Sequence, residues 1–410
     1  MERRTVLKLL ALGGVTSGLA GVGISYWPNE GVWNPCVADA IPSRLLEHDL
    51  VRAAWEGVDP SLYIDCHTHL VGTGDSDSGI WLNPLMQDPL ELTQYVRLQF
   101  YLNASCIREE EEGVDRQYVE QLLSMNKTFS KGAKFMLLAF DMRHDQNGQP
   151  ERQRSAFAIP DKYAAAVVQR YPQRFEWAAS IHPYREDCVE ALEWAVVHGA
   201  KAVKWLPPVM NIDPASSACD RFYAALVKHN IPLLTHAGDE HAVAGVDSQS
   251  FGNPQLLRRA LDHGVKVIVA HCATKGTNPD IDHPNKGEVE NYRLFTRMLD
   301  EPRYEKLLYG DVSAILQLNR VGPHIEELLQ REEWHSRLLN GSDYPLPGVM
   351  PMFSAKSIAD MGLLDKRHVA VLVELRKYNP MLYDFVLKRS LRSKGKRFAA
   401  GIFETRRVLQ

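Results

Sequence analysis

The chain has 410 residues, of which 45% are hydrophobic and 9% aromatic, so it can build a large core and is not disordered as a whole. Its 47 Lys and Arg residues nearly balance 51 Asp and Glu residues, and this formal charge of −4 argues against nucleic-acid binding. Six cysteines at this length exclude a small disulfide-stapled scaffold, and the lack of any Cys-x-x-Cys pair excludes a zinc ribbon. We expect most of the six to be small, buried apolar residues.

Residues 1–40 are predicted to be a targeting segment and linker rather than part of the fold. Arg3 and Arg4 precede an uncharged, apolar stretch that runs from Leu9 to Pro28. This order is that of a signal peptide, and the arginine pair resembles the twin-arginine export signal. Five glycines in the stretch disfavour a permanent membrane helix, although an uncleaved N-terminal anchor stays open as an alternative. We therefore expect export by the twin-arginine machinery, to the periplasm or to the outer face of the inner membrane.

Residues 41–410 are predicted to form one α/β domain, a TIM (β/α)8 barrel with insertions and a C-terminal helix. Eight short runs, apolar on both faces as buried parallel strands are, alternate with helix-like segments. Eight such units favour a closed barrel over an open sheet. The runs are Leu62–Cys66, Phe135–Phe140, Phe175–Ile181, Ala202–Trp205, Ile231–Thr235, Val265–Ala270, Leu307–Tyr309 and Leu338–Leu339. Helices are predicted at Asp161–Tyr171, Asp187–His198 and Asn253–His263.

Two alternating histidines, His67 and His69, follow the first apolar run. Residues i and i+2 of a strand point to the same face, so both imidazoles can converge on one ion. Neutral imidazole is a common ligand of Zn²⁺ and related ions, and Asp65 is a candidate to orient one of these ligands. A pair of core-edge histidines is the less favoured alternative, because a lone histidine would suit that role better than an alternating pair.

Further ligand-type residues follow the later runs. Lys204 ends the fourth run, His236 follows the fifth, His271 the sixth and Asp343 the eighth. In a TIM barrel these strand ends gather at one mouth, where active sites lie. Each histidine alone would more often be a hydrogen-bonded core residue, but the joint pattern favours a metal centre.

These motifs resemble those of the amidohydrolase superfamily, in particular the branch of barrel hydrolases and decarboxylases that includes aminocarboxymuconate-semialdehyde decarboxylase. The resemblance covers residues 62–388 approximately. Its motifs are Asp65-Cys-His67-Thr-His69, Thr235-His236-Ala-Gly238, Ala270-His271-Cys and Gly341-Ser-Asp343-Tyr-Pro345, with Tyr378-Asn379-Pro380 where the branch usually has an Asn-Ala pair.

The resemblance implies that His67, His69, His236 and Asp343 hold a divalent metal ion, for which Zn²⁺ is the favoured identity. His271 would polarise the bound water or the substrate, and Asp343 would take a proton from that water and pass it to the leaving group. One ion is expected. A carboxylated Lys204 would bridge two ions, while an unmodified Lys204 would form an ion pair or bind a substrate anion.

Other charged residues at the predicted mouth are candidates for substrate binding. Glu240 is expected to line the pocket. Arg143, Arg185 and Lys275 could bind a carboxylate through charge-assisted hydrogen bonds, or they could pair with carboxylates of the protein itself.

The sequence therefore predicts a metal-dependent hydrolase that acts on a small amide, ester or lactone with a metal-activated water. Two alternatives stay open: a metal-dependent, non-oxidative decarboxylase of a small carboxylic acid, and a barrel that has lost catalysis and only binds a ligand. The complete set of ligand residues argues against the last. A small molecule is the expected partner, and a homo-oligomer is left open.

Overall fold

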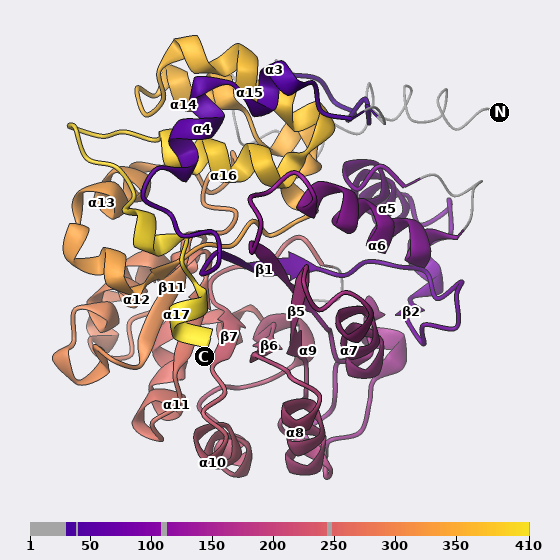
Figure 1. Cartoon of the computed structure of the whole chain (residues 1–410). Helices are drawn as coiled ribbons and strands as arrows, with labels where there is room; N and C mark the ends of the chain where they lie inside the picture. The colour runs from indigo at the N-terminus through magenta and orange to yellow at the C-terminus, as the bar shows by residue number, and fades with distance from the viewer. Residues whose placement is uncertain (1–29, 38–39, 108–112, 244–247, 410) are drawn as a thin grey trace.

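A barrel of eight parallel strands forms the centre of the computed structural model, which describes residues 30–37, 40–107, 113–243 and 248–409 (Figure 1). The strands are, in their order around the sheet, β1 (Ile64–His69), β3 (Lys134–Leu138), β5 (Phe175–Ala179), β6 (Ala202–Trp205), β7 (Leu233–His236), β8 (Val267–Ala270), β11 (Leu308–Asp311) and β12 (Leu338–Leu339). Each of the eight predicted apolar runs overlaps one of these strands. The prediction of a single TIM-barrel domain is confirmed.

The barrel closes between its first and last strands. The Cys66 N–H donates to the Asn340 carbonyl at 2.9 Å, and the His69 N–H donates to the Tyr344 carbonyl at 3.0 Å. Between them, the Asp343 N–H donates to the His67 carbonyl at 2.8 Å. Closure therefore fixes the backbone of the β1 histidines against the loop that carries Asp343.

The barrel interior is a packed apolar core rather than a pore, as in other barrels of this kind. One buried cluster contains side chains from seven of the strands and from α17 (Arg406–Leu409): Ile64, Cys66, Met136, Leu138, Ala178, Ala202, Leu234, Ile268, Leu339, Val408 and Leu409. Because the last two belong to the C-terminal helix, which lies near the middle of Figure 1, that helix fills one end of the barrel.

A β-bulge in β1 changes which of its side chains face the barrel axis. Asp65 pairs with Phe135 and Thr68 with Leu137, so β1 has one residue more than β3 between these pairs. One extra residue reverses the alternation of a strand. As a result, Cys66 and His67, the two residues within the bulge, both turn inward, as does His69 after it, and the histidine pair lies directly above the apolar core.

Helices and two short antiparallel ribbons surround the barrel. The longer helices on its outside are α5 (Leu92–Ala104), α6 (Val114–Asn126), α7 (Asp161–Arg170), α8 (Cys188–Val197), α10 (Asp220–Lys228), α12 (Asn291–Leu299) and α13 (Pro323–Gln330), with the single turn α9 (Pro207–Met210). The ribbons pair β2 (Trp81–Leu82) with β4 (Phe157–Ala158), and β9 (Thr277–Pro279) with β10 (Glu288–Glu290).

Two of the three predicted helices are confirmed as α7 and α8, and the third is divided. Residues 254–257 form a 3₁₀ turn, η5 (Pro254–Leu257), ahead of a short α11 (Arg258–Asp262). The side chain of Gln255 donates to Asp280 and Asp282 and accepts from the Ile281 N–H. These bonds to a neighbouring loop hold the turn away from regular α-helical geometry.

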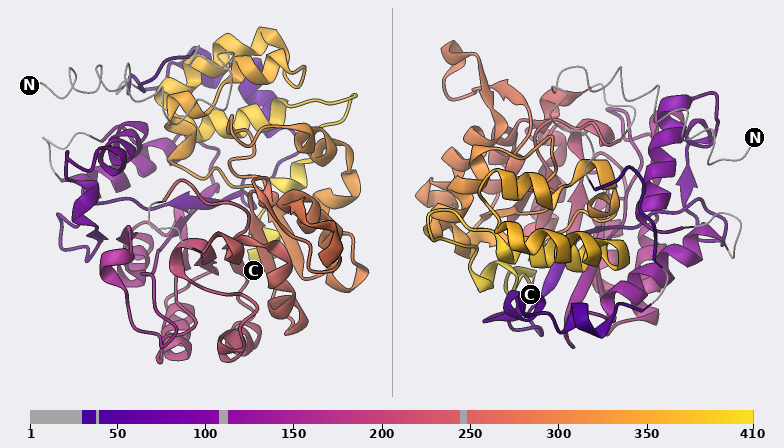
Figure 2. Two further views of the ribbon diagram at one scale, coloured as in Figure 1. Left: turned by 180° about the vertical axis from the view of Figure 1, so that it is seen from behind. Right: turned by 90° about the horizontal axis from the view of Figure 1, so that it is seen from above.

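Segments from both ends of the chain pack together beside the barrel. Figures 1 and 2 show α3 (Ser43–Leu46) and α4 (Asp49–Trp55) against α14 (Ala355–Asp360), α15 (Val369–Tyr378) and α16 (Pro380–Ser390). Arg376, fully buried in α15, donates to three backbone carbonyls and pairs with Glu30 at 3.3 Å. These contacts fasten the start of the described chain to the C-terminal helices.

The cysteines divide into two groups. Four are free and buried, as expected for small apolar residues: Cys66, Cys188, Cys219 and Cys272. The other two, Cys36 and Cys106, form a disulfide between the N-terminal segment and the end of α5. The predicted export signal lies outside the described residues. Within the described ranges, no helix has the length and apolar character needed to cross a membrane.

Candidate metal centre

Three of the predicted ligands meet at the mouth of the barrel. His67 and His69 end β1 and Asp343 follows β12, and their ligand atoms all lie within 4.8 Å of one another. Asp343 Oδ1 is 3.0 Å from His69 Nε2 and 3.4 Å from His67 Nε2. Two imidazole nitrogens and a carboxylate oxygen around one point are a donor set that Zn²⁺ and related divalent ions accept. These residues therefore fit a metal ion.

The cluster is largely shielded from water. His67 and Asp343 are buried, while the side chain of His69 is 22% exposed. Burial would raise the pKa of the Asp343 carboxyl, but the imidazoles of His271, His67 and His69 hold that pKa well below its ordinary value. Asp343 is therefore an anion that can act as a ligand or as a proton acceptor.

A carboxylate that was not predicted from the sequence, Asp311, fixes the tautomer of His67. Asp311 is fully buried at the end of β11, and its Oδ2 lies 2.9 Å from His67 Nδ1. Burial opposes its ionisation, yet His67 and His271 lower the pKa of Asp311 below its ordinary value. An ionised carboxylate only accepts, so Nδ1 of His67 carries the proton and the Nε2 lone pair faces Asp343.

His271 lies on the other side of Asp343. Its Nε2 is 3.7 Å from Asp343 Oδ2, and its ring stacks on that of His67 with centroids 5.1 Å apart. Its Nδ1 is 2.8 Å from Ser313 Oγ, which donates its own proton to Asp311, and 3.1 Å from the Ser313 carbonyl oxygen. Both oxygens therefore accept, so the proton lies on Nδ1 and the Nε2 lone pair faces the carboxylate. Both His271 and Asp343 have left-handed backbones, with φ of +56° and +62°. Such strain in residues other than glycine concentrates at functional sites.

Asp65 and Gly341 join β1 to the loop that carries Asp343. Asp65 Oδ1 accepts from the Ser342 N–H at 2.9 Å and from the His67 N–H at 3.1 Å, so the residue predicted to orient a ligand does so through the backbone. A Cβ on Gly341 would lie 2.7 Å from the Cβ of His67. Only glycine therefore permits this approach of the two segments.

Lys204 and His236, the other two predicted ligands, differ in their relation to the cluster. Lys204 Nζ is 3.2 Å from His67 Nε2, and burial lowers the pKa of the Lys204 ammonium. Among the described residues, His236 is in neither set of clustered ligand atoms. Its Nε2 lies 3.2 Å from the Gly238 carbonyl and its Nδ1 3.7 Å from Glu240 Oε2. Lys204 thus joins the cluster, and metal ligation by His236 stays a prediction.

Three of the predicted substrate-binding residues have partners within the protein: Glu240, Arg185 and Arg143. Glu240 is buried, and its carboxylate accepts from the backbone N–H groups of Ala242 and Val243, so it shapes the loop after β7. Arg185 pairs with Asp141 at 2.9 Å and with Asp187 at 2.8 Å. Arg143 pairs with Glu151 at 2.7 Å. The predicted alternative, in which these arginines pair with the protein's own carboxylates, is what the structure contains.

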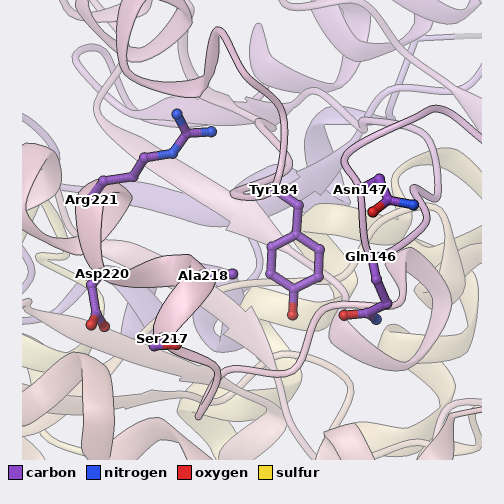
Figure 3. A pocket seen from close by; sticks show the side chains of 7 residues that line it. All are labelled: Gln146, Asn147, Tyr184, Ser217, Ala218, Asp220 and Arg221. Carbon is purple, nitrogen blue, oxygen red and sulfur yellow. The ribbon is translucent and has the colours of Figure 1, made fainter.

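A surface pocket of about 480 Å³ lies apart from the cluster (Figure 3). Its lining residues are Gln146, Asn147, Tyr184, Ser217, Ala218, Asp220 and Arg221, none of which belongs to the candidate metal centre. Both charged residues are already engaged: Asp220 pairs with Arg259 at 2.7 Å, and Arg221 donates to two backbone carbonyls. We assign no function to this pocket.

Replacing Asp311 with asparagine should weaken metal binding by about 10- to 100-fold, the usual effect of losing a carboxylate that orients a ligating histidine. The amide keeps the size of the side chain but loses the charge that holds the proton on His67 Nδ1. Competition with a chromophoric chelator measures the metal affinity. Asp280→Asn is the matched control, because Asp280 is also buried but pairs with Arg297 outside the candidate centre. Equal metal affinity in D311N and the wild type would contradict the assigned role.

Comparison with known structures gives matches of low identity. One is an uncharacterised TIM-barrel protein from Bordetella bronchiseptica, at 14% identity and a TM-score of 0.43 over 70% of this chain and 88% of that one. A probable 2-pyrone-4,6-dicarboxylic acid hydrolase from Acinetobacter baumannii has 15% identity and a TM-score of 0.41, over 78% and 97% of the two chains. A 5-carboxyvanillate decarboxylase from Sphingomonas paucimobilis has 11% identity and a TM-score of 0.42, over 70% and 91%.

Comparison with curated proteins finds no match. The model of one protein family, described as amidohydrolase, matches residues 64–363. This region contains all eight barrel strands and all the clustered side chains, and it is well over half of the chain. The protein belongs to the amidohydrolase family, whose enzymes act on small molecules.

Proposed function

We propose that the protein is a metal-dependent hydrolase of a small amide, ester or lactone. The observation that carries the proposal is the position of Asp343, which shares one oxygen between His67 and His69 and turns the other towards His271. One carboxylate can thus take part in holding an ion and still offer an oxygen for proton transfer.

His67, His69 and Asp343 would hold the ion, with His236 proposed as a further ligand after a small movement of its ring. Zn²⁺ is the ion that we favour from this donor set. A divalent ion held there would lower the pKa of a coordinated water and polarise a carbonyl oxygen. Asp311 would keep the Nε2 lone pair of His67 directed at the ion.

Asp343 and His271 would carry out and direct the transfer of the water proton to the leaving group. Asp343 Oδ2 would accept the proton of the attacking water and then deliver it to the leaving group. His271 Nε2, 3.7 Å away and unprotonated, would accept a hydrogen bond from the same water and so orient it. The Ser313 carbonyl holds the opposite ring nitrogen of His271 and thereby fixes that orientation.

Metal analysis joined to a substrate panel tests the proposal. We expect about one metal equivalent per chain, activity on a lactone, ester or amide, loss of activity on chelation and recovery with added Zn²⁺. Hydrolysis in ¹⁸O-water should place one labelled oxygen in the product carboxylate. Release of CO₂ from an aromatic or other small acid, with no labelled oxygen in the remaining organic product, would replace hydrolysis by decarboxylation. Two metal equivalents and a mass increase of one CO₂ would indicate a carboxylated Lys204.

We also propose that the protein is exported. The Arg3-Arg4 pair and the following apolar stretch support this, as does the Cys36–Cys106 disulfide, because such bonds persist in oxidising compartments. Protein isolated from its producing cells with free thiols at both positions would argue against export.

A further inference from the structure

Arg320 is a buried cation in a loop at the mouth of the barrel. It lies in the loop between β11 and α13 and is 8% exposed. Its Nε and Nη1 atoms are shielded from solvent, and within the described residues neither has a hydrogen-bond partner. Leaving buried donors of a charged group unsatisfied is costly, and each such group in a native structure needs a reason.

The surroundings of Arg320 are those of the metal centre. Burial lowers the pKa of its guanidinium, and the carboxylates of Glu240, Asp343 and Asp311 oppose that shift. Its own charge, after burial, is the largest influence that lowers the pKa of His271. The loop that carries Arg320 follows β11, at the same end of the barrel as Asp311, and the charges of Arg320 and the metal centre influence each other. Among the described residues, no carboxylate is close enough to pair with it.

A second cation shares this region. Burial and then the charge of Arg320 lower the pKa of Lys275, which follows β8. Two cations that repel each other in a poorly solvated space are both stabilised when an anion enters between them. Arg143 and Arg185 do not offer the same opportunity, because each is paired with a carboxylate of the protein.

We infer that Arg320 binds a carboxylate group of the substrate, so that the substrate is a small amide, ester or lactone that also carries a carboxylate. The planar guanidinium presents its N–H groups in a fork that matches the two oxygens of a carboxylate. Such a group would supply the missing acceptors and leave the reactive carbonyl at His67, His69 and Asp343. The inference rests on the proposed function for the type of reaction, and it adds the requirement that the substrate carry a negatively charged carboxylate.

Calorimetric titration with acetate, malonate, succinate and glutarate tests the inference without requiring turnover. In metal-loaded wild type, at least one dicarboxylate should bind ten or more times as tightly as acetate, because one carboxylate reaches the metal and the other reaches Arg320. Arg320→Gln should lower affinity for that dicarboxylate by about 10- to 100-fold, the range for hydrogen bonds to charged groups, with little effect on acetate. Arg44→Gln is the control, since exposed Arg44 pairs with Glu374 in α15, outside the centre.

Arg320→Lys keeps the charge but not the fork, and we expect it to weaken dicarboxylate binding by about three- to tenfold with unchanged metal content. It also covers the case in which R320Q fails to fold, which circular dichroism detects. Dicarboxylates that bind no better than acetate, or equal affinities in the wild type and the folded Arg320 variants, would overturn the inference. Failure of the proposed hydrolysis would appear separately, as Arg320-dependent binding without turnover. Repeating the titrations on chelator-treated protein compares the wild type with the Arg320 variants even if the protein binds no metal.

Discussion

Asp343→Asn should lower kcat by about 10³-fold while the protein retains most of its metal. Asparagine keeps an oxygen that can lie between His67 and His69, but its amide nitrogen cannot accept a proton where Asp343 Oδ2 faces His271. Removal of a general base costs about 10²- to 10⁴-fold in rate. Steady-state kinetics on the best hydrolysed substrate, with metal content measured on the same sample, checks this expectation.

Two further variants separate proton transfer from metal binding. His67→Ala removes a ligand and should lose metal and activity together. Asp300→Asn removes a half-exposed carboxylate that pairs with Arg331 outside the centre, and it should leave both unchanged. If D343N keeps wild-type turnover, or if its activity falls only in proportion to lost metal, Asp343 is not the base.

Replacing Cys36 and Cys106 with serine should lower the free energy of unfolding by about 4 kcal/mol. The bond joins residues 70 positions apart, and in the chain-entropy model a loop of this length is among those whose closure stabilises most. Hydrogen bonds between Asn34 and Asn103 hold the same two segments in the folded state and remain in the variant. Urea unfolding of the double variant measures the difference.

Reduction of the wild-type disulfide provides the control for this measurement. Under a reducing agent the wild type should lose about the same stability as the double serine variant, since both then lack the cross-link. An unchanged urea midpoint in both samples would show that the bond does not constrain the unfolded chain. A loss in the serine variant alone would instead place the effect in the packing of the substituted side chains.

The fold could be predicted from the sequence because each buried parallel strand is visible as a short apolar run of neighbouring residues. Runs such as Val267–Ala270 are apolar on both faces, and eight of them alternate with helices. The histidine pair was also locally visible. The reversal of alternation in β1 was not, because a bulge depends on the pairing with β3 rather than on the residues of β1 alone.

Asp311 and Arg320 are residues of the candidate site that the local sequence pattern did not identify. Asp311 follows directly after Gly310, and this glycine ends the apolar run. Extending the seventh run through Leu308–Asp311 would have placed an acid at its end, as Asp343 follows the eighth run. Arg320 has no local signal, since a loop arginine in a sequence is usually solvated. The loop that carries it is tied to a distant segment, since the Leu318 N–H donates to the Met352 carbonyl at 2.8 Å. His236 was found by pattern, but its ring nitrogens face Gly238 and Glu240.

The filled barrel interior and the C-terminal helix at one of its ends restrict how small molecules can reach the candidate metal centre. Side chains such as Leu234 and Ile268 leave no passage along the axis, and Val408 and Leu409 seal the end opposite the histidines. A substrate, water and product would therefore enter and leave at the end of the barrel that carries His67 and His69. Because the substrate and the product would bind at the same clustered side chains, we expect the product to inhibit competitively with the substrate.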